Sequence, residues 1–145
     1  MNFALIRKQL SRLSHLNWPF RRLEGHLHLG RRGERVAVRH LKRRHYRIIG
    51  RNYRCSLGEI DLIAGDGDTL VFVEVKTRAS HQLQDPSETA GPVKWRRVER
   101  AARHFLARKA KADGPCRFDL VTVLWPSGGS PVVEHFEDAY QPRGQ

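Results

Sequence analysis

The sequence is poor in cysteine and has no long apolar run. Cys55 and Cys116 are its two cysteines among 145 residues, so the chain forms at most one disulfide and lacks the three or four thiolates of many zinc sites. This usage is typical of a reduced intracellular protein, and we expect a cytoplasmic location. No apolar run reaches the roughly 18 residues of a membrane span. The apolar start of the chain is broken at Arg7-Lys8, so we expect neither export nor membrane insertion.

Acidic residues are scarce in the first third of the chain. Residues 1–44 hold 12 of the 27 Lys and Arg but only 2 of the 15 acidic residues, and therefore carry +10 of the net charge of +12. A basic block of this kind is either a solvated arm or helix face, or a surface that binds a polyanion. The imbalance favours nucleic acid or an acidic membrane surface as partner and disfavours small-molecule metabolism.

The length is sufficient for one compact domain and leaves no room for a second. We expect this domain over residues 30–140, with a short C-terminal tail over 141–145. We expect a basic N-terminal extension over 1–29, because Pro19 and Gly25 interrupt any long periodic pattern there. A basic amphipathic helix and an organelle transit segment are the alternatives for this region.

The hydrophobic pattern predicts a sheet flanked by helices. Apolar spacing indicates helices over 33–41 and 93–112, with a further helix around Glu137. Strands are expected over 46–53, 59–64, 69–76, 118–125 and near 132–133. We therefore expect an α/β fold with a mixed central sheet of about five strands.

Charged residues interrupt two strands that are otherwise apolar. Glu74 and Lys76 stand two apart in a Val-rich run, so their side chains point to one side of the strand. Glu59 and Asp61 share the polar side of the preceding strand in the same way. Burial of a charge costs several kcal/mol unless the charge is paired or binds a metal. These positions are therefore candidates for a site.

A hairpin between the two strands would bring these charges together. A turn centred on Asp66-Gly67 pairs Glu59 with Glu74 and sets Asp61 diagonal to Glu74, with all three acids on one face. Repulsion among them calls for a cation, and Mg²⁺ (or Mn²⁺) is suited to one or two carboxylates plus substrate phosphates. Asp61 and Glu74 are the predicted metal ligands, with Glu59 as an accessory acid.

Lys76 would complete a hydrolytic site. Beside a metal it would orient or help to deprotonate an attacking water, or stabilise negative charge on a phosphate oxygen. The alternative is a surface hairpin on which Glu59, Glu74 and Lys76 form a ladder of ion pairs. The strand pattern is compatible with either arrangement.

Several separated blocks point to a family. They are Gly33-Glu34, Asn52-Tyr53-Arg54, the run from Gly58 to Ala64, the run from Leu70 to Arg78, Lys94 and Arg117-Phe118-Asp119. With these blocks in this order, residues 30–140 closely resemble the YraN-like family of small bacterial proteins. That family is similar to the restriction-endonuclease-like superfamily, which carries an Asp followed by an Asp/Glu-x-Lys pair, and in layout to archaeal Holliday-junction resolvases.

The resemblance implies a restriction-endonuclease-like core and a homodimer. It also implies that Asp61 and Glu74 bind the metal, that Lys76 is catalytic, and that Glu34 either contacts a water at the metal or orients Lys76. The alternative for Glu34 is a first-turn glutamate favoured by the helix dipole. The chain departs from the superfamily at Ile60, where Pro is common.

We expect a magnesium-dependent endonuclease that acts on DNA, including branched or otherwise structured DNA. One alternative is a non-catalytic nucleic-acid-binding or adaptor protein that retains the nuclease fold. Another is a membrane-surface protein that uses residues 1–23. Six basic residues are either phosphate contacts or solvated surface: Arg35, Arg39, Arg43, Arg78, Lys94 and Arg97.

Overall fold

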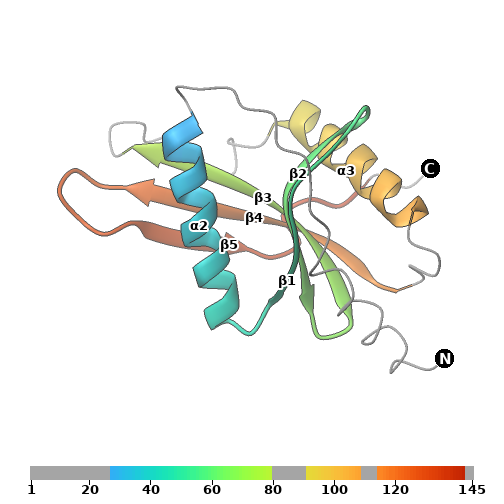
Figure 1. Cartoon of the computed structure of the whole chain (residues 1–145), viewed down its shortest axis with the longest axis horizontal. Helices are drawn as coiled ribbons and strands as arrows, with labels where there is room; N and C mark the ends of the chain where they lie inside the picture. Colours follow the sequence, from blue (N-terminus) through green and yellow to red (C-terminus); the bar gives the residue numbers. More distant parts are fainter. Residues whose placement is uncertain (1–26, 80–90, 109–113, 143–145) are drawn as a thin grey trace.

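The computed structural model describes residues 27–79, 91–108 and 114–142. The expected N-terminal extension thus lies almost wholly outside the described residues. Two helices flank five strands in the described part (Figure 1). The elements are α2 Leu27–Arg43, β1 Arg47–Cys55, β2 Gly58–Asp66, β3 Thr69–Ala79, α3 Pro92–Ala107, β4 Cys116–Trp125 and β5 Val132–Phe136.

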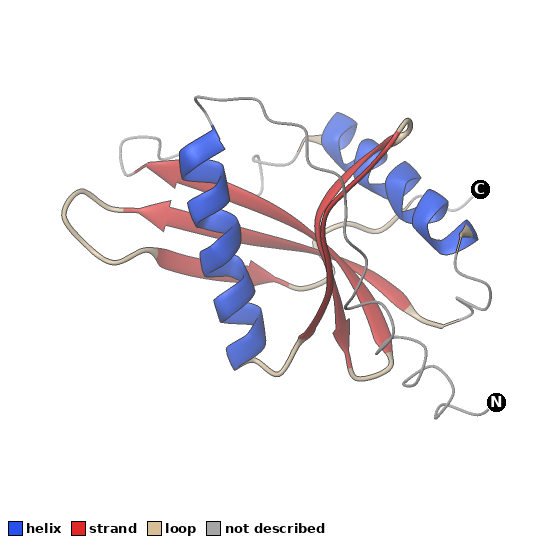
Figure 2. Cartoon of the chain, viewed as in Figure 1, coloured by secondary structure: helices blue, strands red, loops and turns tan. Residues whose placement is uncertain are grey.

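The five strands form one mixed sheet in the order β1-β2-β3-β4-β5 (Figure 2). All neighbours are antiparallel except β3 and β4, which are parallel. A parallel pair needs a crossover connection, and α3 lies in the chain between these two strands. The predicted mixed sheet of five strands flanked by helices is confirmed.

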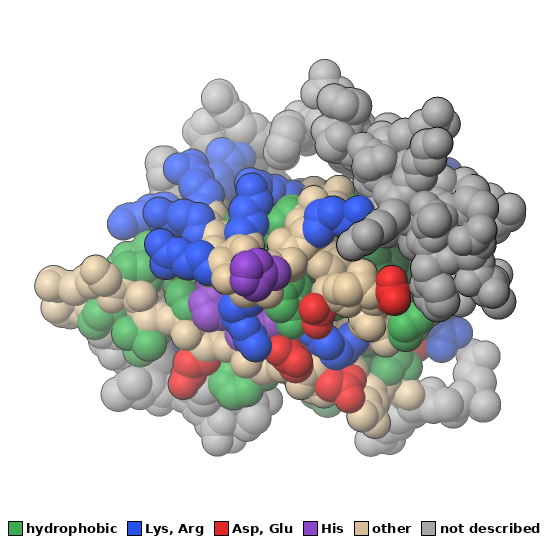
Figure 3. All heavy atoms as spheres, turned by 90° about the horizontal axis from the view of Figure 1, so that it is seen from below, with side chains coloured by type: hydrophobic (Ala, Val, Ile, Leu, Met, Phe, Trp, Pro, Cys, Tyr) green, Lys and Arg blue, Asp and Glu red, His purple; other side chains and the backbone are tan. Residues whose placement is uncertain are grey.

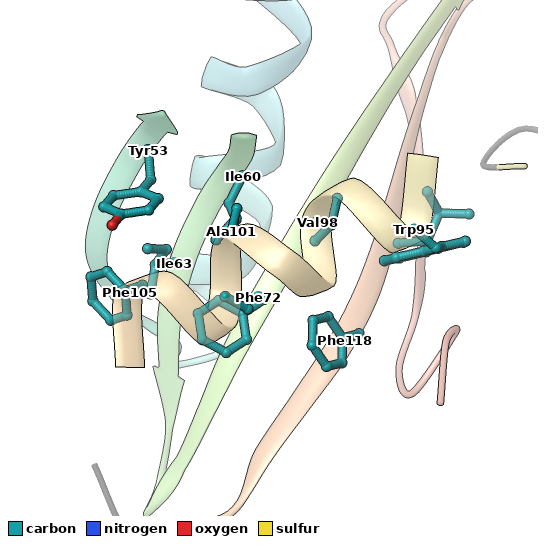
Figure 4. Close-up of a cluster of buried hydrophobic side chains, with 11 residues drawn as sticks. Tyr53, Ile60, Ile63, Phe72, Trp95, Val98, Ala101, Phe105 and Phe118 are labelled. Carbon is teal, nitrogen blue, oxygen red and sulfur yellow. The ribbon is translucent and has the colours of Figure 1, made fainter. Parts of the chain in front are cut away.

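The helices cover opposite faces of the sheet. The buried side of α2, with Ala37 and Leu41, packs on small and branched residues of β2, β3 and β4. The α3 side is richer in aromatic groups: Phe105 of the helix packs edge-on against Phe72 of β3, and Trp95 lies at the other end of the cluster (Figure 4). Neither helix is long and apolar enough to cross a membrane, as far as the described residues go.

The helix predicted around Glu137 is wrong. The chain makes a turn there, and Asp138 adopts a left-handed φ of 53°. Tertiary contacts account for the difference: the Glu137 carboxylate accepts a hydrogen bond from Arg44, and the next residues lead Tyr140 onto α3, where its ring stacks on Trp95 at 5.2 Å. These contacts favour an extended chain over a last helical turn.

The hairpin register also differs from the predicted one. Asp66 pairs with Thr69 and Leu62 pairs with Val73, so the two-residue turn consists of Gly67 and Asp68. Gly67 supplies the left-handed φ of 55° that this turn requires. The shift moves each pairing by two residues, and a shift of two preserves which face each side chain occupies.

Buried Asp119 joins β4 to β5. Its carboxylate is fully buried and accepts hydrogen bonds from Arg117 Nε at 2.8 Å, His135 Nε2 at 2.8 Å and the Asp138 amide at 3.0 Å. Burial acts to raise the pKa of Asp119, but the hydrogen bonds from His135 and Arg117 hold it below its ordinary value. The Arg117-Phe118-Asp119 block is thus accounted for by the structure of the sheet edge.

Close packing of β2 against α3 predicts the effect of one substitution. A Cβ at Gly58 would overlap the backbone carbonyl of Arg97, which cannot move without shifting the helix. We expect Gly58→Ala to lower the free energy of unfolding by about 1–3 kcal/mol, the usual cost of overpacking. Urea denaturation measures this change.

Gly30→Ala is the matched control. A Cβ at Gly30 meets nothing within 4 Å, and alanine is favoured over glycine in a helix by roughly 0.5–1 kcal/mol. This variant should be as stable as the wild type or slightly more so. If Gly58→Ala and Gly30→Ala lowered the free energy of unfolding by the same amount, the packing argument would be contradicted.

Candidate metal centre

The candidate site lies where β2 and β3 part. Their pairing ends at Leu62 and Val73, and one step further the same register sets Asp61 opposite Glu74. There Asp61 Oδ2 accepts a hydrogen bond of 2.8 Å from the backbone N–H of Val75. The Asp61 carboxylate thus takes the place of a backbone partner for β3 and is held against that strand.

The two carboxyl groups lie together in a poorly solvated place. Glu74 is 3% exposed, and its neighbours include the Asp61 carboxyl. Burial, then the Asp61 charge beside it, raises the pKa of Glu74 to about 8. Burial likewise raises the pKa of Asp61, although the Val75 amide opposes this effect. The structure therefore brings together the two acids that the sequence proposed as ligands.

A lysine from α3 lies beside this pair. Lys94 Nζ is 3.3 Å from Oε1 of Glu74 and 3.3 Å from Oε1 of Glu59. Burial acts to lower the pKa of Lys94, but the carboxylates of Glu74, Asp61 and Glu59 outweigh it and raise that pKa. The predicted accessory acid is thus in the cluster, and Lys94 is engaged with acids within it.

Glu34 approaches from the other face of the sheet. It lies on α2, is half-buried, and accepts a hydrogen bond of 3.0 Å from Asn52 Nδ2 on β1. Burial raises the pKa of Glu34, the Asn52 hydrogen bond opposes this, and the Asp61 charge adds to it. The Asp61 charge is thus near enough to act on Glu34, so α2 brings this acid toward the carboxyl pair.

Lys76 is half-buried on β3, beside Thr122 of β4. It stands two residues beyond Glu74, so both side chains project from the same side of the strand. None of the described residues forms an ion pair with Lys76 within 4 Å. The Lys76 ammonium thus has no acidic partner in the described part of the chain, whereas the Lys94 ammonium contacts Glu59 and Glu74.

The residues present suit a hard divalent cation. Glu74 Oε2 is buried, and no donor among the described residues reaches it. Its neighbour is the Asp61 carboxyl, with which Glu74 shares a hydrogen bond when protonated; once both acids are ionised, the buried pair is costly unless a cation satisfies it. Within the described ranges no group of three or more His, Cys, Asp and Glu side chains is arranged to hold a metal. Mg²⁺ typically takes one or two carboxylates and completes its shell with water and substrate phosphates. The Asp61–Glu74 pair fits that pattern.

The basic candidates divide between the two faces of the sheet. Arg35, Arg39 and Arg43 are exposed on α2, and Arg97 is exposed on α3. Arg78 is half-buried near the end of β3. In the view from below, most Lys and Arg side chains gather in one patch, acidic side chains lie along the other side, and His side chains lie between them (Figure 3).

Sequence reasoning missed two contributions to the site. Asn52 has a left-handed φ of 51° and hydrogen-bonds Glu34. The sequence predicts Lys94 as a basic surface residue, but its ammonium contacts the acidic cluster. A signal was present for Asn52, because it is a polar residue of a type that tolerates φ > 0 inside a strand. Spacing along the chain offers none for Lys94.

Comparison with known proteins gives a consistent result. Residues 33–123 match the model of a family described as "Uncharacterised protein family UPF0102". The UPF0102 protein of Geotalea uraniireducens is 46% identical over 113 residues, which cover 78% of this chain and 89% of that relative. The UPF0102 protein of Streptomyces griseus is 49% identical over 108 residues, covering 74% of this chain and 91% of that relative.

The raised pKa of Glu74 predicts how stability depends on pH. Between the ordinary value of 4.5 and about 8, the folded protein holds a proton on Glu74 that the unfolded chain has lost. The free energy of unfolding should therefore fall as pH rises through this window. Glu74→Gln should make the decline shallower, as measured by thermal unfolding from pH 5 to 9 without divalent ions.

Glu134→Gln is the control for this experiment. Glu134 is exposed on β5 and forms no ion pair with the described residues, so its variant should keep the wild-type pH dependence. Identical profiles for wild type and Glu74→Gln would show that Glu74 is not the group responsible.

Proposed function

The chain belongs to the UPF0102 family, in agreement with its resemblance to YraN-like proteins, and we propose that it is a metal-dependent nuclease that hydrolyses DNA phosphodiester bonds. The observation that carries this proposal is that the Asp61 and Glu74 carboxyl groups meet in a buried position, where no donor among the described residues reaches Glu74 Oε2. Lys76 follows on the same side of β3. We further infer a restriction-endonuclease-like core.

In this proposal Asp61 and Glu74 hold Mg²⁺ or Mn²⁺. When bound, such an ion stabilises charge on a phosphoryl group and makes water a better nucleophile. The Val75 amide fixes the Asp61 carboxylate through a backbone hydrogen bond, so the ligand is positioned before any ion arrives. Burial excludes competing water from Glu74.

Lys76 and Glu34 have separate tasks in this proposal. Lys76 places a positive charge beside the developing negative charge of the phosphate and so favours the transition state. Glu34 is half-buried and its pKa is raised, which suits a group that accepts a proton or orients a water near Asp61. Asn52 holds the Glu34 carboxyl in place through its hydrogen bond.

Exposed bases provide the DNA contacts. Arg35 and Arg39 follow each other at helical spacing on the outer side of α2, and neither forms an ion pair with the described residues. Guanidinium groups free of acidic partners are suited to backbone phosphates. Arg43, Arg78 and Arg97 extend the predicted contacts. The homodimer, the cytoplasmic location and a preference for branched DNA stay predictions.

A specific observation favours the second candidate, a non-catalytic nucleic-acid-binding or adaptor protein. Lys94 already forms ion pairs with both Glu59 and Glu74 without a metal. A protein that has lost turnover would gain stability from such an arrangement, because the buried carboxylates would need no divalent ion. The two candidates share the basic surface and differ in whether the site cuts DNA.

Cleavage assays separate the candidates. With Mg²⁺ or Mn²⁺ the wild-type protein should cut linear, flapped or branched DNA, and Asp61→Asn should not, because the substitution removes one ligand charge while keeping the side-chain shape. Gel analysis of end-labelled DNA measures the products. If the wild type shows no cleavage above the Asp61→Asn background on any substrate, the adaptor function is favoured.

Lys76→Ala should separate binding from turnover. Metal binding should survive, since Lys76 is not a ligand, but the cleavage rate should fall by about 10²–10³, as on removal of one positioned electrostatic stabiliser. Single-turnover kinetics and calorimetric metal titration check the two parts. Loss of metal binding in this variant would contradict the assignment.

DNA affinity should fall steeply with salt. The log–log slope should be about −0.9 per phosphate neutralised. In the Arg35→Gln/Arg39→Gln double variant the slope should decrease by about two, with the same loss on unrelated duplexes. Fluorescence anisotropy at several salt concentrations measures this. A slope that is unchanged in the double variant would exclude this face of α2 as a phosphate-binding surface.

A further inference from the structure

The chain supplies its own cation beside the buried carboxyl pair. The Lys94 ammonium is equidistant, at 3.3 Å, from Oε1 of Glu74 and Oε1 of Glu59. The second oxygens differ: Glu74 Oε2 is buried with no donor from the described residues, whereas Glu59 Oε2 lies 3.5 Å from Arg54 Nε. One ammonium is thus shared by an acid that is 4% exposed and an acid that is 33% exposed.

We propose that Lys94 is an internal counter-cation that competes with a divalent ion for Glu74, and that Glu59 receives its ammonium when the ion binds. This inference rests on the proposed metal centre and concerns how that centre is regulated. It assigns to Lys94 a positioning role at the site instead of a DNA contact. Glu59 then acts through Lys94 and is not itself a metal ligand.

The geometry favours an exchange of partners. A lysine carries a compact charge on a flexible stem of four carbons, and the Lys94 side chain is 30% exposed, so its ammonium can be rehydrated as it moves. Arg54 holds the far oxygen of Glu59, which leaves Oε1 directed to Lys94. A movement away from Glu74 therefore does not leave the ammonium without an acid.

Electrostatics give the exchange its direction. Without a metal, the Lys94 ammonium offsets the negative charge that Asp61 and Glu59 place beside Glu74. With a divalent ion at Glu74, an ammonium at the same oxygen repels the ion. Lys94 should thus stabilise the metal-free protein and weaken metal binding, two effects that one substitution can measure.

Lys94→Met tests both effects without DNA, because methionine keeps much of the apolar stem and removes the charge. Calorimetric titration with Mn²⁺ should give a Kd roughly tenfold lower than that of the wild type. The metal-free Tm should fall by several degrees, and saturating Mn²⁺ should recover it. Lys94→Arg keeps the charge and should not tighten binding, which guards against an effect of altered packing.

Lys42→Met is the matched control. Lys42 is an exposed lysine in the last turn of α2, two helical turns beyond Glu34, and the substitution removes the same charge. Its Mn²⁺ affinity and metal-free Tm should equal those of the wild type. If Lys42→Met also bound Mn²⁺ tenfold more tightly, the effect of Lys94→Met would be due to net charge alone, and the proposal would be overturned.

Glu59→Gln tests the acceptor. In the wild-type background it should weaken Mn²⁺ binding, because Lys94 then has only Glu74 as an acid partner. In the Lys94→Met background the same substitution should have little effect. Equal losses in both backgrounds would make Glu59 a direct contributor to the metal and would refute its role as acceptor.

The outcomes distinguish this proposal from the proposed function. If the wild type and Lys94→Met both fail to bind Mn²⁺, the metal centre itself fails, and a fall in the metal-free Tm still decides whether Lys94 is a counter-cation. If the wild type binds Mn²⁺ and Lys94→Met binds it no more tightly, the metal centre stands and the competition is refuted.

Discussion

The candidate site depends on one hydrogen bond, from the Val75 amide to the Asp61 carboxylate. It forms where β2 and β3 stop pairing, so the backbone of β3 is satisfied by a side chain instead of a strand. An unsatisfied buried amide would be costly, and the carboxylate removes that cost while remaining beside Glu74. The Asp61 carboxylate therefore lies beside Glu74 because β2 and β3 stop pairing at this point.

Two layers of packing hold this opening in place. Phe72, just before Glu74 on the same side of β3, is fully buried under α3, and Val73 is fully buried under α2. With an apolar layer on each face, β3 cannot rotate to expose its acid. The buried Glu74 lowers the stability of the fold, and the packing of the surrounding core compensates for this loss. Such compensation is typical of functional sites.

The same arrangement links stability to ligand binding. A buried acid pair without a cation is unfavourable, and Lys94 provides a positive charge beside this pair. Lys94 lies on α3, the helix that also supplies much of the aromatic core. The charge balance of the site therefore depends on α3 being docked. This dependence connects a helix far along the chain to the chemistry of the β2–β3 hairpin.

The sequence by itself determined the order of the two helices and five strands and the side of β3 shared by Glu74 and Lys76, because side-chain alternation along a strand is a local property. The two-residue error in register left that face unchanged for the same reason. Only the tertiary structure decided that Glu34 approaches Asp61 and that Lys94 pairs with Glu59 and Glu74. Those contacts join residues far apart in the chain, and their formation depends on how two helices dock on opposite faces of a sheet.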